Sequence, residues 1–166
     1  MRKTIVGVMG GCSADDRTLE NAREIGRLIA ENGWTLLSGG RPTGVMQASV
    51  TGAHEAGGFT IGVLYDEDRD MGSEGLDIVI PTGMGAGRNV INILSSDVVV
   101  ACQGTGGTTS EIAMALRFGR PVVLLDFDPG KKFLDSTAAA PKYSMAETPA
   151  EAAQMVAAYL KELGRE

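Results

Sequence analysis

Short apolar runs that alternate with amphipathic segments constrain the fold of this chain more than any other feature of its sequence. Runs typical of buried strands lie at residues 4–9, 34–38, 59–64, 77–80, 97–101 and 121–126, and helix-like segments lie at 15–32, 45–56, 88–95, 108–118 and 148–163. Strands that alternate with helices form a parallel sheet with helices on both faces. The sequence therefore predicts an α/β fold, a Rossmann-like doubly wound parallel sheet, with residues 1–166 in a single domain.

Some segments give weaker or purely local signals. Residues 65–75 are charged and contain glycine, which predicts a surface loop, and residues 128–147 show no clear pattern. Thr148-Pro149-Ala150-Glu151 fits a capping box with proline at the first helical position, so we expect the last helix to begin there.

Glycine clusters follow most of the strand-like runs. The chain has 23 glycines among 166 residues, about twice the share of roughly 7% that is typical of proteins. Eleven of them fall in four clusters, which are Gly10-Gly11, Gly39-Gly40-Gly44, Gly83-Gly85-Gly87 and Gly104-Gly106-Gly107. Ligands of such sheets bind at the carboxyl ends of the strands, where the strand order reverses. The clusters therefore predict a ligand site at this edge of the sheet.

The segment from Gly104 to Ser110 has the features of an anion-binding loop. Its glycines let the backbone approach an anion, and a helix that begins there offers unpaired N–H groups and the positive end of its dipole. We therefore expect a small-molecule ligand that bears a phosphate. The candidate binding residues of the loops are Gly10, Gly11, Cys12, Ser13, Ser38, Gly39, Gly40, Gly104, Thr105, Gly106, Gly107, Thr108 and Thr109.

Arg88 and Glu111 are the charged candidates, and each has two interpretations. Arg88 opens a helix, where its charge opposes the helix dipole, so it either binds a phosphate or carboxylate or is a solvated surface residue. Glu111 completes the pattern Thr108-Thr109-Ser110-Glu111, a capping box in which the glutamate is structural. Alternatively, its carboxylate lies at the floor of the site and orients a ribose hydroxyl or a water. Arg88, Asn89 and Glu111 complete the set of candidate binding residues.

The chain lacks the motifs of several common enzyme classes. GxGxxG after the first strand, GxxxxGK[ST] and GxSxG are all missing, which counts against a dinucleotide site, a Walker-type hydrolase and an α/β-hydrolase. The one histidine, His54, has no second histidine to complete a metal motif, and we expect it at the surface. We expect no dedicated metal site.

Charge and hydropathy exclude two classes of partner. The chain has 21 acidic and 15 basic residues, a net charge of -6, and nucleic-acid binding depends on Lys and Arg, so we expect no nucleic-acid partner. No apolar stretch approaches the roughly 20 residues that span a bilayer, and no cleavable signal is visible. We therefore predict a cytoplasmic protein with no membrane partner.

The two cysteines, Cys12 and Cys102, are too few for a disulfide framework. We expect each of them to be a small, half-buried residue.

Several motifs together resemble the LONELY GUY phosphoribohydrolase superfamily, also called lysine decarboxylase-like, whose mark is PGGxGTxxE. The resemblance spans nearly the whole chain and rests on Ser38-Gly39-Gly40, Gly44-Val45-Met46, and Gly104, Gly107, Thr108 and Glu111. Within the superfamily the chain is most similar to the molybdenum cofactor carrier proteins, through residues 4–11, Thr82-Gly83-Met84, Arg88-Asn89 and residues 94–97. The resemblance implies that the first strand lies beside the strand at 97–101, with residues 10–13 facing 103–109 and both cysteines near the crevice.

The chain departs from the phosphoribohydrolase pattern around the catalytic residues. Arg88 and Glu111 match the catalytic arginine and glutamate, but Gln103 and Thr105 differ from the Pro-Gly-Gly start, and Asn89 stands where the pattern has lysine. The resemblance therefore implies a non-catalytic carrier of a phosphorylated, nucleotide-like ligand, the molybdenum cofactor. One alternative is a phosphoribohydrolase that releases a free base from a nucleoside 5′-monophosphate, with Arg88 and Glu111 catalytic. Another is a nucleotide sensor that acts through a partner protein.

The resemblance also has implications for macromolecular partners. It implies a homo-oligomer, a dimer or a tetramer, and the apolar residues Val45, Met46 and Val50 of the second helix agree with this expectation. For a carrier, the recipients of the cofactor would be molybdoenzymes.

Overall fold

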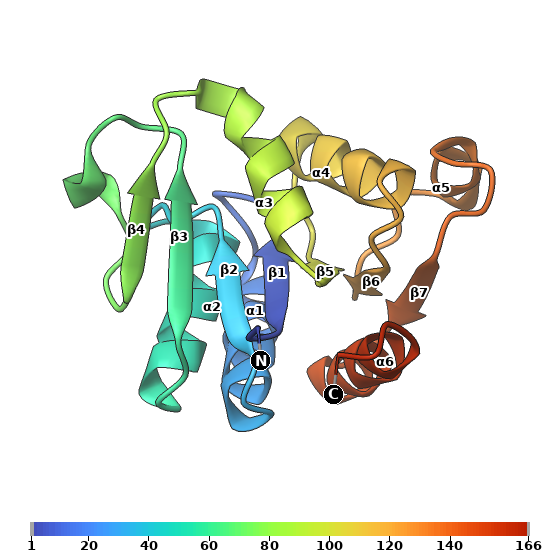
Figure 1. Cartoon of the computed structure of the whole chain (residues 1–166), viewed down its shortest axis with the longest axis horizontal. Helices are drawn as coiled ribbons and strands as arrows, with labels where there is room; N and C mark the ends of the chain where they lie inside the picture. Colours follow the sequence, from blue (N-terminus) through green and yellow to red (C-terminus); the bar gives the residue numbers. More distant parts are fainter. Residues whose placement is uncertain (1, 166) are drawn as a thin grey trace.

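A seven-stranded parallel sheet runs through the molecule in the computed structural model, which describes residues 2–165. The strand order is β4-β3-β2-β1-β5-β6-β7 (Figure 1). The strands are β1 (Ile5–Met9), β2 (Thr35–Ser38), β3 (Thr60–Leu64), β4 (Ile78–Pro81), β5 (Val98–Ala101), β6 (Val122–Leu125) and β7 (Tyr143–Ala146). This confirms the predicted Rossmann-like α/β fold.

Three helices pack on each face of the sheet. The helices on one face are α1 (Asp16–Glu31), α2 (Gly44–Glu55) and α6 (Pro149–Glu162), and those on the other face are α3 (Asn89–Ser95), α4 (Gly106–Arg117) and α5 (Lys131–Ser136) (Figure 1). Each face has its own apolar core, because successive strand residues point to opposite sides. Thus Val98 and Val100 of β5 belong to the core with α1, α2 and α6, whereas Val99 and Ala101 belong to the other.

Local sequence signals set the ends of the long helices. Asp15 caps α1, since its Oδ1 accepts a hydrogen bond of 2.8 Å from Thr18 N, and Gly33 follows the helix with a φ of 73°. Thr148 Oγ1 accepts a bond of 3.3 Å from Glu151 N at the start of α6. The predicted start of the last helix is therefore confirmed.

The helix after β5 begins earlier than the sequence pattern suggests. It starts at Gly106, after an extended Thr105, so Glu111 lies beyond the first turn. The capping-box interpretation of Glu111 is therefore wrong. Glycine has a low intrinsic preference for helix, which explains why the pattern placed the start at residue 108.

Residues 128–147, left without a predicted element, contain α5 and β7. β7 pairs with β6 at the edge of the sheet, and only Ala146 of its four residues is buried. The six-residue α5 buries Leu134 alone. Neither element therefore carries a hydrophobic period long enough to detect. The predicted loop 65–75 also contains a short 3-10 turn, η1 (Arg69–Met71).

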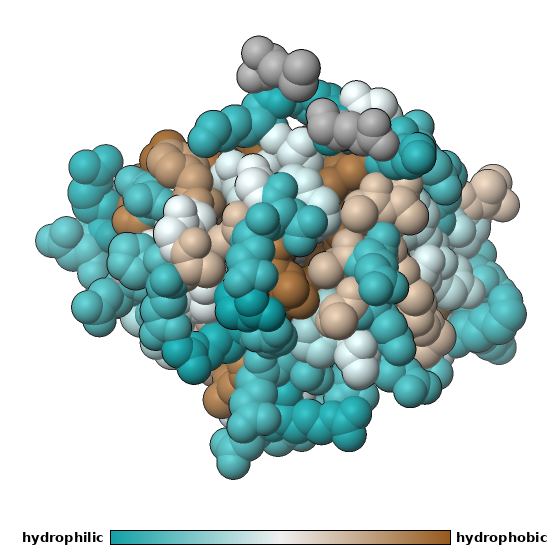
Figure 2. All heavy atoms as spheres, turned by 90° about the horizontal axis from the view of Figure 1, so that it is seen from below, coloured by the Kyte–Doolittle hydropathy of each residue, from teal (hydrophilic) through white to brown (hydrophobic). Residues whose placement is uncertain are grey.

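The two ends of the sheet differ in character. At the amino ends of the strands, Asp97 pairs with Arg2 at 3.0 Å and lies 3.5 Å from Arg165, and the surface at this end has hydrophilic residues around its rim and apolar ones between them (Figure 2). At the carboxyl ends the glycine-rich loops meet. Among residues 2–165, no helix combines the length and the apolar character that a membrane-spanning segment needs.

Candidate functional site

The candidate site lies at the carboxyl ends of β1 and β5, where the strand order reverses. The loops after the two strands are joined, because Gly11 N donates to Gln103 O at 3.0 Å, and Val45 N of α2 donates to Gly11 O at 3.0 Å. Glycine is required for this contact: a Cβ on Gly104 would lie 2.1 Å from Thr108 Oγ1 and 2.9 Å from Gly11 N. The two loops therefore face one another, as the resemblance implies.

The N-terminus of α4 offers hydrogen-bond donors to this crevice. The side chain of Thr105 makes no capping bond, and the first backbone bond of the helix runs from Thr109 N to Thr105 O at 3.0 Å. The N–H groups of Gly106, Gly107 and Thr108 thus have no partner among the described residues. A Cβ on Gly106 or Gly107 would meet no atom within 4 Å, so open space lies beside these two residues. Such a helix end attracts an anion.

Arg88 is buried beneath the crevice, with 9% of its side chain exposed. It ends the 3-10 turn η2 (Gly85–Arg88), and its guanidinium lies against the backbone of Gly39, where a Cβ would be 2.5 Å from Nη1. Its Nε has no hydrogen-bond partner among the described residues. The interpretation of Arg88 as a solvated surface residue is therefore wrong. A buried donor left unpaired costs about 1–3 kcal/mol, which an anionic ligand would offset.

Glu111 faces Arg88 from the first half of α4. Its carboxylate Oε1 lies 3.8 Å from Arg88 Nη1, too far for a hydrogen bond, and accepts a bond of 3.1 Å from Nδ2 of the fully buried Asn92. Burial raises the pKa of Glu111, and the Asn92 bond and the charge of Arg88 act in the opposite direction. Burial also lowers the pKa of Arg88, and the charge of Glu111 opposes this shift. Burial therefore disfavours the charged form of each group, and the attraction between the two charges opposes this effect.

These groups line a cavity of about 180 Å³. The candidate binding residues that line it are Gly10, Gly11, Cys12, Gly39, Arg88, Asn89, Thr105, Gly107, Thr108 and Glu111. The candidates outside its lining are Ser13, Ser38, Gly40, Gly104, Gly106 and Thr109. Some of these have structural contacts instead: Ser38 Oγ accepts from Gly40 N at 3.0 Å in the turn after β2, and Thr109 Oγ1 donates to Thr105 O at 3.2 Å.

Sequence analysis missed further residues of the cavity wall, among them Met46 and Tyr65. Tyr65 follows β3 directly and is 40% exposed. An aromatic residue that immediately follows a strand, at the same edge as the glycine clusters, was a signal that the glycine count did not capture. Asn92 gave no such signal, because its contact with Glu111 depends on the packing of α3 against α4.

The two cysteines have different environments. Cys12 is exposed and lines the cavity, whereas Cys102 is 1% exposed and does not. Burial raises the pKa of the Cys102 thiol to about 12, so this thiol is protonated at neutral pH. Among the described residues, no three His, Cys, Asp or Glu side chains gather as a metal site requires.

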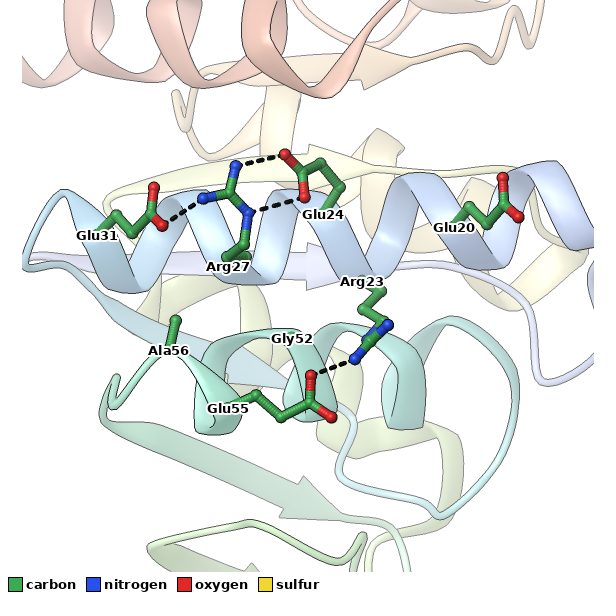
Figure 3. Close-up of a pocket in the computed structure, with 8 residues that line it drawn as sticks. All are labelled: Glu20, Arg23, Glu24, Arg27, Glu31, Gly52, Glu55 and Ala56. Carbon is green, nitrogen blue, oxygen red and sulfur yellow. Dashed lines mark hydrogen bonds and ion pairs between the residues drawn. The ribbon is translucent and has the colours of Figure 1, made fainter.

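A larger hollow, of about 560 Å³, lies between α1 and α2, away from the strand ends (Figure 3). Arg27 Nε donates to Glu24 at 2.8 Å, Nη1 of the same side chain pairs with Glu31, and Arg23 pairs with Glu55 across the two helices. These exposed charges satisfy one another. The crevice at β1 and β5 is the better candidate despite its smaller volume, because the buried Nε of Arg88 has no partner among the described residues.

Comparison with known proteins identifies the family of the chain. The sequence profile of the SLOG cluster4 family matches residues 3–155. The chain belongs to the SLOG cluster4 family. A protein of Archaeoglobus fulgidus without an assigned function is 42% identical to it over 125 residues, which are 75% of this chain and 82% of that protein. A cytokinin riboside 5′-monophosphate phosphoribohydrolase of Mycobacterium tuberculosis is 33% identical over 116 residues, 65% of this chain and 62% of the enzyme.

Two solved structures resemble this SLOG cluster4 chain over almost its whole length. The molybdenum cofactor binding protein from the phototrophic bacterium Rippkaea orientalis is 42% identical, with a TM-score of 0.90 over 96% of this chain and 99% of that one. The molybdenum cofactor carrier protein from Chlamydomonas reinhardtii is 43% identical, with a TM-score of 0.88 over 96% and 99% of the two chains. The resemblance inferred from the sequence is thus confirmed.

Proposed function

We propose that this protein binds the molybdenum cofactor and carries it intact. The observation that carries the proposal is a cavity at the start of α4, where the first amides of the helix have no partner among the described residues, beside the buried Arg88, whose Nε is likewise unpaired. Proteins that are 42%, 43% and 44% identical to this chain, over 99% of their own length, bind or carry this cofactor. The cofactor is a pterin with a terminal phosphate, so it brings an anion to these donors.

The chemistry of the cavity fits this cargo. The phosphate would lie in the open space before Gly106, Gly107 and Thr108, where the amides and the helix dipole favour an anion. Arg88 would donate from Nε to an anionic group further along the ligand. A carrier must release its ligand unchanged, and the described lining includes no histidine, lysine or serine, so the thiol of Cys12 is its strongest nucleophile.

The test is retention of the cofactor by the purified protein. Molybdenum cofactor released from a molybdoenzyme is mixed with the protein and separated by size exclusion, and the retained pterin and molybdenum are measured by fluorescence and mass spectrometry. We expect both to elute with the protein in equal amounts. Elution of the cofactor only in the small-molecule fractions, as with a heat-denatured sample, would contradict the carrier function.

The second candidate function is that of a phosphoribohydrolase. The buried pair of Arg88 and Glu111 favours it, as does the relative from Mycobacterium tuberculosis. In such an enzyme Glu111 would stabilise positive charge on the ribose or activate water, and Arg88 would hold the phosphate. Against it stand Gln103, Thr105 and Asn89, because a displacement of reacting groups by about 1 Å can cost roughly 100-fold in rate.

The two functions differ in what happens to a nucleoside 5′-monophosphate. We predict that the protein releases little or no free base from adenosine monophosphate or an N6-modified analogue, followed by chromatography. Release at ordinary enzyme rates that is abolished by Glu111→Ala and by Arg88→Ala would establish the enzyme and overturn the carrier.

We further propose that the protein is a homo-oligomer, a dimer or a tetramer. The residues first thought to favour assembly do not, because Val45, Met46 and Val50 are buried within the chain. Apolar surface lies instead on β4, where Ile78 is 41% and Ile80 43% exposed. Light scattering at micromolar concentration should give a multiple of the chain mass, and Ile80→Lys should lower it. A monomer mass for the unaltered protein would contradict this proposal.

A carrier also needs recipients and a compartment. We propose that molybdoenzymes lacking the cofactor accept it from this protein and that the exchange takes place in the cytoplasm. Activation of such an enzyme by the loaded protein, but not by the protein alone, tests the transfer, and cell fractionation tests the location.

A further inference from the structure

Tyr65 occupies the wall of the cavity furthest from α4 in the strand order. It follows β3 directly, is 40% exposed and has two guanidinium groups over its ring: the Cζ of Arg41 is 5.0 Å and that of Arg88 5.8 Å from the ring centre. An aromatic ring in cation–π contact with two arginines and partly exposed at the mouth of a cavity gains little by burial in the fold itself. Its position suits contact with a ligand.

The surroundings of Tyr65 are held in place. Arg41 Nη1 lies 3.2 Å from each carboxylate oxygen of Asp66, and the side chains of this pair are only 21% and 19% exposed. The backbone carbonyl of Tyr65 accepts a hydrogen bond of 3.2 Å from Gly85 N. Fixed neighbours lower the conformational entropy that a binding site loses when its ligand arrives.

The strand order indicates how far apart the two ends of the site lie. From the loop before α4 to Tyr65 the cavity crosses the ends of β5, β1, β2 and β3, which are neighbours in that order (Figure 1). Neighbouring strands lie about 4.8 Å apart, so the ends of β5 and β3 are about 14 Å apart. Arg88 lies between these ends, against Gly39 after β2. A compact anion bound at α4 cannot reach Tyr65, whereas an elongated ligand can.

We infer that Tyr65 is the platform on which the planar heteroaromatic ring of the ligand stacks, with the guanidinium groups of Arg41 and Arg88 beside it. This inference rests on the proposed function and adds the orientation of the bound cofactor. The phosphate lies at the start of α4, the anionic group between phosphate and ring lies at Arg88, and the pterin ring lies at the end of β3. Tyr65 thereby selects ligands that carry a planar ring at this distance from the phosphate.

Binding of two probes by Tyr65 variants tests the platform. The molybdenum cofactor has both phosphate and ring, and ribose 5-phosphate has the phosphate alone. Stacking on an aromatic side chain contributes enough that Tyr65→Ala should weaken cofactor binding about 10- to 100-fold. Tyr65→Phe keeps the ring and should bind close to the unaltered protein, and neither variant should change binding of ribose 5-phosphate.

A second readout reports the stacking itself. Pterin fluorescence should be quenched on binding to the unaltered protein and to Tyr65→Phe, and quenched less in Tyr65→Ala. Unchanged cofactor affinity in Tyr65→Ala, or an equal loss for both probes, would overturn the platform alone. An unaltered protein that retains no cofactor would overturn the proposed function and the platform with it.

Discussion

Gly104 and Gly107 are three residues apart in one loop, but their missing side chains serve different purposes. A Cβ on Gly104 would lie 2.1 Å from Thr108 Oγ1 and 2.9 Å from Gly11 N, so this glycine lets the two site loops touch. A Cβ on Gly107 would meet no protein atom within 4 Å. Gly107 therefore leaves free the space in which we propose that the phosphate binds.

Variants of these two glycines therefore distinguish an effect on ligand binding from an effect on folding stability. We predict that Gly107→Val weakens binding of a phosphorylated ligand at least about tenfold, since the loss of one or two charge-assisted bonds costs more than 1.4 kcal/mol, with little change in melting temperature. Gly104→Val should lower the melting temperature clearly, because the side chain collides with backbone. Calorimetry of binding and of unfolding measures both. Unchanged ligand affinity in folded Gly107→Val would contradict the anion site at α4.

Asn92 lowers the pKa of Glu111 through a hydrogen bond, although it does not line the cavity. Its Nδ2 donates to Glu111 Oε1 at 3.1 Å and thereby opposes the rise in pKa caused by burial. We predict that Asn92→Leu raises the pKa of Glu111 further and destabilises the fold by about 1–3 kcal/mol. A carboxyl with a raised pKa in the folded state stabilises the protein while protonated. The free energy of unfolding of the variant should therefore decrease as pH rises through the ionisation of Glu111.

Titration of the Glu111 carboxyl carbon by NMR measures this effect directly. Asn89→Leu is the control, because Asn89 lies on the same helix and bonds weakly to Ser110 at 3.4 Å rather than to Glu111. An unchanged or lower midpoint for Glu111 in Asn92→Leu would show that Asn92 does not hold its charge.

Two helices, α1 and α2, cross at glycines that bring their backbones into contact. A Cβ on Gly52 of α2 would lie 1.8 Å from Arg23 O, and one on Gly26 of α1 would lie 2.1 Å from Ser49 O. Because α2 also carries Val45, whose N–H bonds to Gly11 O at 3.0 Å, the crossing fixes one wall of the site.

At this crossing a single methyl group should have a large effect. We predict that Gly52→Ala destabilises the protein by about 1–3 kcal/mol, since backbone atoms cannot move aside as a flexible side chain would. Gly106→Ala is the matched control in α4, where the added methyl meets no atom within 4 Å, and it should be neutral or slightly stabilising. Urea unfolding compares the two. Equal stability of both variants would mean that the helices separate at little cost.

The whole chain shares one sheet between its two apolar cores. Both cores include residues of β1, β2, β5 and β6, so neither can come apart while the other remains. We predict that residues 1–166 unfold in one transition, as a single domain does. Fluorescence of the one tryptophan, Trp34, and far-ultraviolet circular dichroism should give the same midpoint. Separate midpoints would indicate two independently folding parts.

Ligand binding should raise the midpoint of this single unfolding transition. A ligand that binds only the folded state stabilises it by about 2.7 kcal/mol at a concentration 100 times its Kd. Saturating molybdenum cofactor should therefore raise the common midpoint for both probes, and the rise should be lost in Gly107→Val. A midpoint that does not respond to the cofactor would argue against binding to the folded protein.

The sequence by itself determined the class of fold and the edge of the sheet at which the candidate site lies. Apolar runs such as residues 97–101 form buried strands in a parallel sheet, so their alternation with helices predicts the fold class. A glycine cluster that directly follows such a strand lies at the carboxyl edge of the sheet, so the local pattern also predicts the edge. The same reasoning failed for β7, which is specified by its pairing with β6 and not by its own residues. It also misplaced the start of α4, because two glycines conceal the first turn.

Only the tertiary structure decided which side chains act together. Arg88, Asn92 and Glu111 are up to 23 residues apart, and their burial, distances and pKa directions arise from the packing of α3 on α4 beneath the crevice. Tyr65 joins them because β3 ends at the same edge, two strands from β1. Desolvation and pairing depend on neighbours in space, and for these residues the neighbours come from distant parts of the chain.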